Sequence, residues 1–374
     1  MCCMSLGYKI GYFCGDVKRL FDDMKEIKPT LLPTVPRLLD RVYGEIQKKI
    51  DRKKIGVFKS VFFKVMYSLK RRSLCNGDYR KQHLADGVVF GQIQAMFGGR
   101  LKLVLVGSSP SNPDVLGFMK VVLGCVVIEG YGQTECAGAS HTQPLYDISV
   151  GNVGTSLQCC ETKIIDASEL KYYARNNSGE LCIRGYNVFQ GYYKRPDETK
   201  KVLDSDGWLH TGDIVMISTK DNKVSIVDRK NEIFKLSQGE YIVPTKIEQV
   251  YQKMDVVSQC LVYGSPYKSF TVAIVVPDNE VLLNIAEKNN ITGSYEDLCK
   301  HPKLKDIIMK LIHAASTEAQ LSGVEKVRNI YLSSEPFTID NGLLTPTMKI
   351  RRSVCASYFR QQIDSLYNTD GNQI

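Results

Sequence analysis

The sequence lacks the hallmarks of several protein classes. No apolar run reaches the roughly 18 residues that a membrane-spanning helix needs. The five histidines lie far apart, and none stands at a ligand interval from a cysteine or an aspartate, which argues against a zinc site. No aromatic residues are interleaved with the basic ones for stacking on bases, so we expect no nucleic-acid partner. Repeats and low-complexity stretches are also absent.

Cysteine and charge are both plentiful. Twelve cysteines include the adjacent pairs Cys2-Cys3 and Cys159-Cys160, and most others are embedded in apolar runs, which favours a reducing intracellular compartment over a disulfide framework. Lys and Arg exceed Asp and Glu by 49 to 40, and this scattered net charge of +9 suits anionic small ligands or membrane surfaces. We expect the basic runs at 48–54 and 70–72 to lie on solvated helix faces.

The order of apolar segments predicts an α/β fold. A strand near 101–109, a helix near 112–124 and a strand near 125–130 form a doubly wound α/β unit, whose ligands bind at the carboxyl ends of the strands. A further strand is expected at 8–13, in "YKIGYF".

Two changes of pattern follow. Short alternating strands predict a β-rich subdomain over 151–228, which completes a large domain over 1–228. A helix from Pro244, then strands and two further helices, predict a small, mobile α+β domain over 229–374, with a hinge near 228–231.

The stretch "EGYGQTECAG", from Glu129 to Gly138, follows a predicted strand and contains three glycines. Gly130 and Gly132 permit tight turns and the close approach of a ligand, and Tyr131 between them can stack on a planar base. An ordinary structural turn is an equally good interpretation of the stretch taken alone.

The same stretch contains three further candidates. Thr134 offers a hydroxyl to a phosphate oxygen, and Glu135 is a hard oxygen ligand suited to Mg²⁺. Cys136 suggests a nucleophile, but no neighbouring His or Lys lowers its pKa, so an inert thiol is favoured.

Three polar motifs lie further along the chain. Asp213 of "HTGD" can accept both hydroxyls of a ribose, or belong to an ordinary turn. Arg229 of "DRK" can join that ribose or a phosphate, or form a salt bridge with Asp228. Lys349, in "PTMKIRR", lies in a segment that can also be a solvated basic tail or an anionic-lipid patch.

Read in order, these motifs resemble the adenylate-forming superfamily, and within it the long-chain acyl-CoA synthetases. The resemblance covers essentially all 374 residues and rests on the following segments: "GSSP", "EGYGQTE", "GELCIRG", "GWLHTGD", "DRKNEIFKLSQGEYIVP" and "LLTPTMKIRR". It is specific because six motifs recur in one order, and the segment "NVFQGYYKRP" also resembles the long-chain acyl-CoA synthetases.

The resemblance implies fatty-acid activation with ATP, Mg²⁺ and coenzyme A, through acyl-AMP and pyrophosphate. Catalytic roles fall on Lys349, which would bridge the carboxylate and the α-phosphate, and on Thr134 and Glu135, with Glu135 holding the metal. The implied ATP and AMP contacts are these residues: Gly107, Ser108, Ser109, Pro110, Glu129, Gly130, Tyr131, Gly132, Gln133, Thr134, Asp213, Arg229 and Lys349.

The family's second step, thioester formation, implies a rotation of the small domain about the hinge. This rotation would remove Lys349 from the site and bring in the face around Lys235 and Gly239. Asn231 stands where many relatives have a lysine, which puts a basic contact from the hinge in doubt.

The Ser/Thr/Gly-rich pyrophosphate loop of the family is not found in the sequence. We therefore expect a C-terminal portion that adenylates little by itself, and a full-length enzyme anchored through an N-terminal segment to the cytosolic face of the endoplasmic reticulum, the outer mitochondrial membrane or the peroxisome. Alternatives are another adenylate-forming ligase, or an inactive product that acts as a nucleotide-binding or interaction module. No oligomeric state is indicated.

Overall fold

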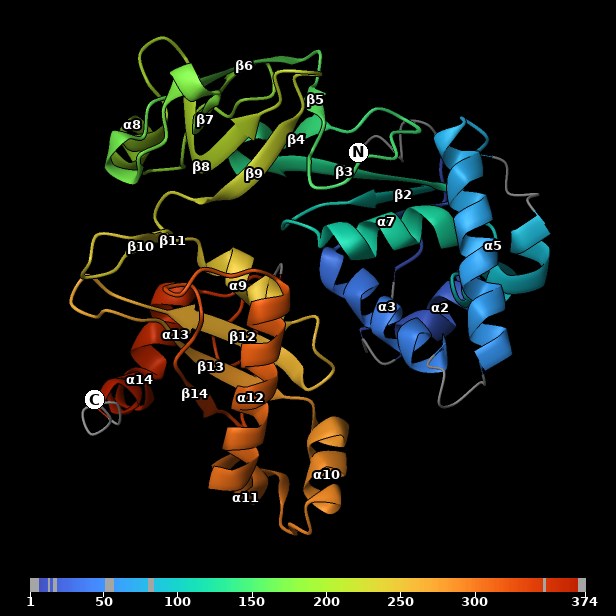
Figure 1. Ribbon diagram of the computed structural model, residues 1–374. Helices are drawn as coiled ribbons and strands as arrows, with labels where there is room; N and C mark the ends of the chain where they lie inside the picture. Colours follow the sequence, from blue (N-terminus) through green and yellow to red (C-terminus); the bar gives the residue numbers. More distant parts are fainter. Residues whose placement is uncertain are drawn as a thin grey trace. The chain divides into compact units, whose positions relative to one another are not determined.

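The computed structural model describes residues 7–12, 14–15, 19–50, 57–79, 84–345 and 348–368. By its internal contacts the chain divides into two compact units. The first comprises Met1–Lys163, Cys182–His210 and Met216–Ile226, and the second comprises Ile164–Leu181, Thr211–Val215 and Val227–Ile374. The mixed α/β fold class expected from the sequence is confirmed (Figure 1).

The first unit is built on a sheet in the order β1-β2-β3-β4-β5. Strands β1 (Leu31–Thr34), β2 (Leu103–Val106) and β3 (Val126–Gln133) are parallel, whereas β4 (Gly138–Thr142) and β5 (Thr155–Ser156) are antiparallel. Val104, Val106 and Val127 on the parallel strands are almost fully buried, as expected of strands that helices cover.

The helices of this sheet are α2 (Leu20–Ile27), α3 (Pro36–Ile50), α5 (Val57–Cys75), η2 (Asp86–Phe90), α6 (Gly91–Met96) and α7 (Pro113–Val122). Helix α7 packs against β3, α3 and α5 (Figure 1). It begins cleanly because Asn112 caps it by accepting a hydrogen bond from the backbone of Asp114, and Pro113 occupies its first turn.

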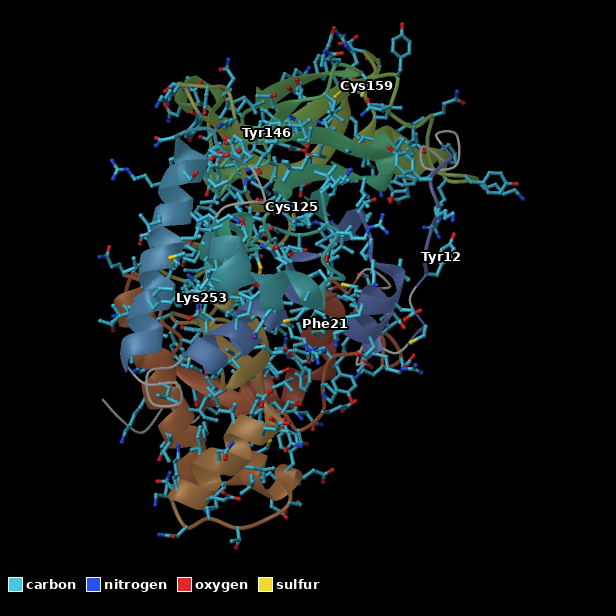
Figure 2. All side chains as sticks on the ribbon, turned by 90° about the vertical axis from the view of Figure 1, so that its right-hand side faces the viewer. Tyr12, Phe21, Cys125, Tyr146, Cys159 and Lys253 are labelled. Carbon is cyan, nitrogen blue, oxygen red and sulfur yellow. The ribbon has the colours of Figure 1, made fainter. Side chains whose placement is uncertain are left out.

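Two expectations fail in this unit. Residues 8–12 form no strand: they are exposed and pair with no strand of the described residues, and Tyr12 projects away from the chain around it (Figure 2). In the basic run 70–72, Arg71 and Arg72 are exposed as expected, but Lys70 is 2% exposed and its ammonium pairs with the buried carboxylate of Asp86. A buried lysine requires such a partner. The side chains of the run at 48–54 lie outside the described part of the chain.

The β-rich region forms a sheet in the order β6-β7-β8-β9. Its strands are β6 (Cys160–Ile165), β7 (Ser178–Gly185), β8 (Leu209–Ile217) and β9 (Val224–Arg229), with short helices η4 (Ser168–Leu170), η5 (Ala174–Asn176) and α8 (Pro196–Val202). The short strands expected over 151–228 are therefore present, and the division into units passes through them.

The rest of the second unit is an α+β arrangement. A short hairpin, β10 (Phe234–Lys235) and β11 (Tyr241–Ile242), precedes the sheet of β12 (Val257–Tyr263), β13 (Val272–Pro277) and β14 (Asn329–Leu332). Its helices are α9 (Pro244–Tyr251), α10 (Asn279–Lys288), α11 (Tyr295–Lys300), α12 (Pro302–Glu318), α13 (Arg352–Tyr358) and α14 (Arg360–Asn368).

Strand β13 has a buried residue at every position. Ala273 and Val275 belong to the core under α9 and α12, while Val272 and Ile274 belong to the core under α13 and α14. The alternation follows from the two-residue period of a strand, so helices cover both faces of this sheet (Figure 1). Among the described residues, none of the helices combines the length and the apolar character needed to cross a membrane.

Candidate nucleotide-binding site

The glycines expected in a loop after β3 lie within a strand instead. Strand β3 continues to Gln133 and pairs antiparallel with β4, with a bulge between Tyr131 and Gly132. A Cβ atom on Gly132 would lie 1.6 Å from the carbonyl oxygen of Gly138, and one on Gly130 would lie 3.2 Å from that of His141. These glycines are therefore needed for the close approach of two backbones.

Tyr131 is half-buried on β3 beside His141 of β4. The ring centroids are 5.9 Å apart and the rings meet edge to face. Gln133 Nε2 donates to Tyr131 Oη at 3.3 Å. Burial lowers the pKa of His141 to about 4, so its imidazole is neutral at pH 7. Tyr131 thus has a fixed and uncharged support.

The 3₁₀ turn η3 (Thr134–Cys136) follows β3, with Thr134 exposed and Glu135 half-buried. Tyr192 Oη donates to Glu135 Oε1 at 2.6 Å, and the backbone amide of Phe189 donates to the carbonyl of Glu135 at 2.8 Å. Burial, followed by the hydrogen bond to Glu135, raises the pKa of Tyr192 to about 12, so the phenol keeps its proton.

Sequence reasoning did not find Tyr192. It lies 57 residues from Glu135, in "NVFQGYYKRP", and no spacing rule links two residues so far apart. The recurrence of that segment in the resemblance was the available signal.

Cys136 is placed as a structural residue. Its thiol is fully buried and accepts a hydrogen bond from the backbone of Gln133 at 3.2 Å. Burial raises its pKa, which disfavours the reactive thiolate and supports the interpretation as an inert thiol.

The "GSSP" segment follows β2, with Gly107 half-buried and Ser108, Ser109 and Pro110 exposed. Ser108 adopts a left-handed backbone, with φ of 83°. Next to this segment, the backbone amide of Ser111 donates to Glu129 Oε1 at 3.0 Å.

Glu129 is 3% exposed, and burial raises its pKa although the hydrogen bonds from Ser111 oppose this. Its backbone amide donates to Gln143 Oε1, which also accepts from Lys120 Nζ at 2.9 Å. Glu129 therefore links β3 to the segment after "GSSP", so its side chain acts as a support in this geometry.

A second group of predicted residues gathers in the second unit. Arg229 Nε lies 3.8 Å from Asp213 Oδ1, and its Nη1 lies 3.8 Å from Glu232 Oε1. Asp228 accepts a hydrogen bond from the backbone amide of Arg229 rather than pairing with its guanidinium. Burial and then the charge of Arg229 lower the pKa of the half-buried Lys349, while Asp213 and Glu232 oppose this.

The structure therefore brings together Asp213, Arg229 and Lys349, which are more than a hundred residues apart at the extremes. We name these three residues with Glu232 the Lys349 cluster. The cluster combines carboxylates that can accept ribose hydroxyls with cations suited to a phosphate.

The segment after Lys349 is not a solvated tail. The side chain of Arg352 is 17% exposed, and its guanidinium contacts Glu248 at 2.5 Å and Glu232 at 2.8 Å. Nothing in a run of basic letters indicates such burial, because the partners lie 104 and 120 residues away.

The residues assigned to the thioester step occupy the hairpin of β10 and β11. Lys235 is exposed, and its ammonium lies 5.4 Å from the ring centroid of Tyr241. Gly239 has φ of 89° in the connecting turn, a conformation that favours glycine. The two residues are neighbours, since a Cβ atom on Gly239 would lie 3.8 Å from Lys235 Cε.

The donors around η3 fit a magnesium ion that arrives with a nucleotide. In the part of the chain that the structure describes, no three His, Cys, Asp or Glu side chains gather as a protein-only metal cage. Mg²⁺ is commonly held by one or two carboxylates together with phosphates and water. Glu135 beside the hydroxyl of Thr134 matches that donor set.

Comparison with known proteins places these features in a family. The sequence profile described as AMP-binding enzyme matches residues 1–193. The chain is 44% identical over 365 residues to long-chain-fatty-acid–CoA ligase 5 of Mus musculus, covering 98% of this chain and 53% of that protein. It is 40% identical over 367 residues to the peroxisomal long chain acyl-CoA synthetase 7 of Arabidopsis thaliana, covering 96% and 52%.

Solved structures agree with this assignment. The adenylation domain of a carboxylate reductase from Mycobacterium chelonae has a TM-score of 0.75 at 29% identity, covering 96% of this chain and 50% of that one. The corresponding domain from Segniliparus rugosus, in complex with AMP and a co-purified carboxylic acid, has a TM-score of 0.72 at 26% identity, covering 97% and 50%. The chain spans about half the length of the curated relatives it matches. It belongs to the AMP-binding enzyme family.

Proposed function

We propose that this chain carries part of the site of an enzyme that joins long-chain fatty acids to coenzyme A through acyl-AMP. The observation that supports this most is the similarity to long-chain-fatty-acid–CoA ligases at 43–44% identity over 97–98% of the chain. The geometry of the two residue groups is compatible with it. We further propose that the whole protein is associated with an intracellular membrane.

The first unit would contribute the base, phosphate and metal contacts. Tyr131 would support the adenine ring, with "GSSP" on its other side. The hydroxyl of Thr134 would donate to the α-phosphate, and Glu135 would hold Mg²⁺. When bound, the metal would neutralise phosphate charge as the carboxylate attacks.

The second unit would contribute the ribose contacts and the catalytic cation. Asp213 would accept hydrogen bonds from the ribose hydroxyls, and Arg229 would donate to the same ribose. Lys349 would donate to the carboxylate and α-phosphate oxygens as negative charge builds on phosphorus. Burial, which lowers its pKa, strengthens it as a hydrogen-bond donor.

Thioester formation would use a different face of the second unit. We place the domain boundary and hinge at 228–231, where the backbone amide of Lys230 donates to Gly212 and Asp228 is bound by backbone amides. Lys235 and Gly239 of the β10–β11 hairpin would then approach coenzyme A.

A hybrid enzyme tests this function. The chain would replace the matching 365-residue region of the mouse ligase, and exchange of labelled pyrophosphate into ATP would be measured with palmitate. We expect the hybrid to exchange, and the chain by itself to exchange little because it lacks the pyrophosphate loop motif. A folded hybrid that binds AMP and shows no palmitate-dependent exchange would refute the proposal.

A further inference from the structure

Two residues from a distant segment of the first unit, Phe189 and Tyr192, form hydrogen bonds with Glu135. Tyr192 Oη donates to Glu135 Oε1 at 2.6 Å, and the amide of Phe189 donates to the Glu135 carbonyl at 2.8 Å. Tyr192 is itself fixed, because its amide donates to Thr199 Oγ1 at 2.9 Å and its ring packs edge-on against Phe189 with centroids 4.9 Å apart. The phenol is therefore in place before any ligand arrives.

This hydrogen bond engages one of the two carboxylate oxygens. Within the described residues, Glu135 Oε2 accepts no hydrogen bond and forms no ion pair. A phenol is a neutral donor, so it adds no positive charge beside Glu135, as a lysine or arginine partner would. The contact thus restricts the side-chain torsions while one oxygen remains available as a ligand.

We propose that Tyr192 is a positioning residue that orients Glu135 toward the divalent cation bound with the nucleotide. This inference rests on the proposed function, because it takes a nucleotide-bound cation as the ligand of Glu135. Hydrogen-bond partners of metal ligands fix ligand orientation, and their removal typically weakens metal binding about 10- to 100-fold.

The adjacent tyrosine provides a matched control. Tyr193 is 86% exposed, and no described side chain hydrogen-bonds to it. Tyr192→Phe and Tyr193→Phe each remove one hydroxyl and keep the ring. Only the first removes a contact to Glu135.

The experiment measures Mn²⁺ binding to the whole chain. Binding of Mn²⁺ together with α,β-methylene-ATP is followed by the change in the electron paramagnetic resonance spectrum of the nucleotide-bound Mn²⁺ as the chain is added, for the unsubstituted chain and both variants. We expect the Mn²⁺ dissociation constant to rise about 10-fold in Tyr192→Phe and to stay unchanged in Tyr193→Phe. Binding of the ATP analogue without metal, and the thermal unfolding midpoint, should be the same in all three.

Each other outcome counts against the inference. Equal Mn²⁺ affinity in the unsubstituted chain and Tyr192→Phe would overturn it while leaving the proposed function intact. An equal loss of metal-free nucleotide binding, or a lowered unfolding midpoint, would show that the hydroxyl acts on the fold. If the unsubstituted chain bound no Mn²⁺ with the analogue, the metal role of Glu135 would be rejected, whereas the proposed function is judged separately by pyrophosphate exchange in the hybrid enzyme.

Discussion

Replacement of Arg352 by methionine should destabilise the second unit far more than the same replacement of Arg351. Three guanidinium nitrogens of Arg352 donate to carboxylates: Nη1 and Nη2 to Glu248 at 2.7 and 2.5 Å, and Nε to Glu232 at 2.8 Å. The exposed Arg351 donates to the carbonyl of Gly342 at 3.1 Å.

The size of the expected loss of stability follows from the buried carboxylate that Arg352→Met leaves without its partner. The side chain of Glu248 is 6% exposed, and besides Arg352 it accepts a hydrogen bond from the amide of Val262 at 2.7 Å. Removing one partner of a buried pair leaves an uncompensated charge and costs about 3–5 kcal/mol. Arg351→Met should change the free energy of unfolding by no more than about 0.5 kcal/mol, as at other exposed positions.

The assay is hydrogen exchange of peptides from α9 and β12 under increasing urea, which reports the opening free energy of this unit. Adding Glu248→Gln to Arg352→Met should recover more than about 1 kcal/mol, because a neutral amide oxygen still accepts from Val262 without a buried charge. A loss below about 1 kcal/mol in Arg352→Met, or no recovery in the double variant, would refute the electrostatic reasoning.

Three further predictions concern the candidate site. Gly132→Ala should lower the thermal unfolding midpoint, because its Cβ would lie 1.6 Å from a backbone oxygen, whereas Gly44→Ala in the open interior of α3 should stabilise by up to about 1 kcal/mol; similar midpoints would contradict this. The pKa of His141 is lowered from 6.5 to about 4, so the neutral imidazole should contribute about 3 kcal/mol to the free energy of unfolding above pH 6.5, and this contribution should be lost as the pH falls toward 4. In urea unfolding experiments, His141→Gln should lack this loss. In the hybrid enzyme, Lys349→Ala should abolish pyrophosphate exchange and spare palmitoyl-CoA formation from supplied palmitoyl-AMP; equal loss of both half-reactions would remove the proposed division of roles.

The fold followed from local patterns to a large extent. The apolar run after Lys102 became β2, Pro113 opened α7 and Pro244 opened α9, because burial periodicity and proline geometry act within a few residues. The strand expected over 8–13 failed at 8–12, since a strand also needs a partner and the sequence does not state which one is available.

The sequence indicated candidate residues for the site but not their contacts. The motif order indicated Glu135, Asp213, Arg229 and Lys349, and the structure gathers the last three in one cluster. Motif order could not indicate that Gly132 lies in a strand and allows two backbones to approach closely, because the sequence letter is the same for a glycine in a strand and in a loop.

By itself, the sequence determined the α/β class, the approximate elements and the family resemblance, since these depend on residue type, spacing and order. Only the tertiary structure decided which charges are buried and which side chains contact the candidate residues. Lys70, Arg352 and Tyr192 acquire their roles from Asp86, Glu248 and Glu135 respectively, at separations of 16, 104 and 57 residues. Such pairings arise from packing between elements, which no local pattern records.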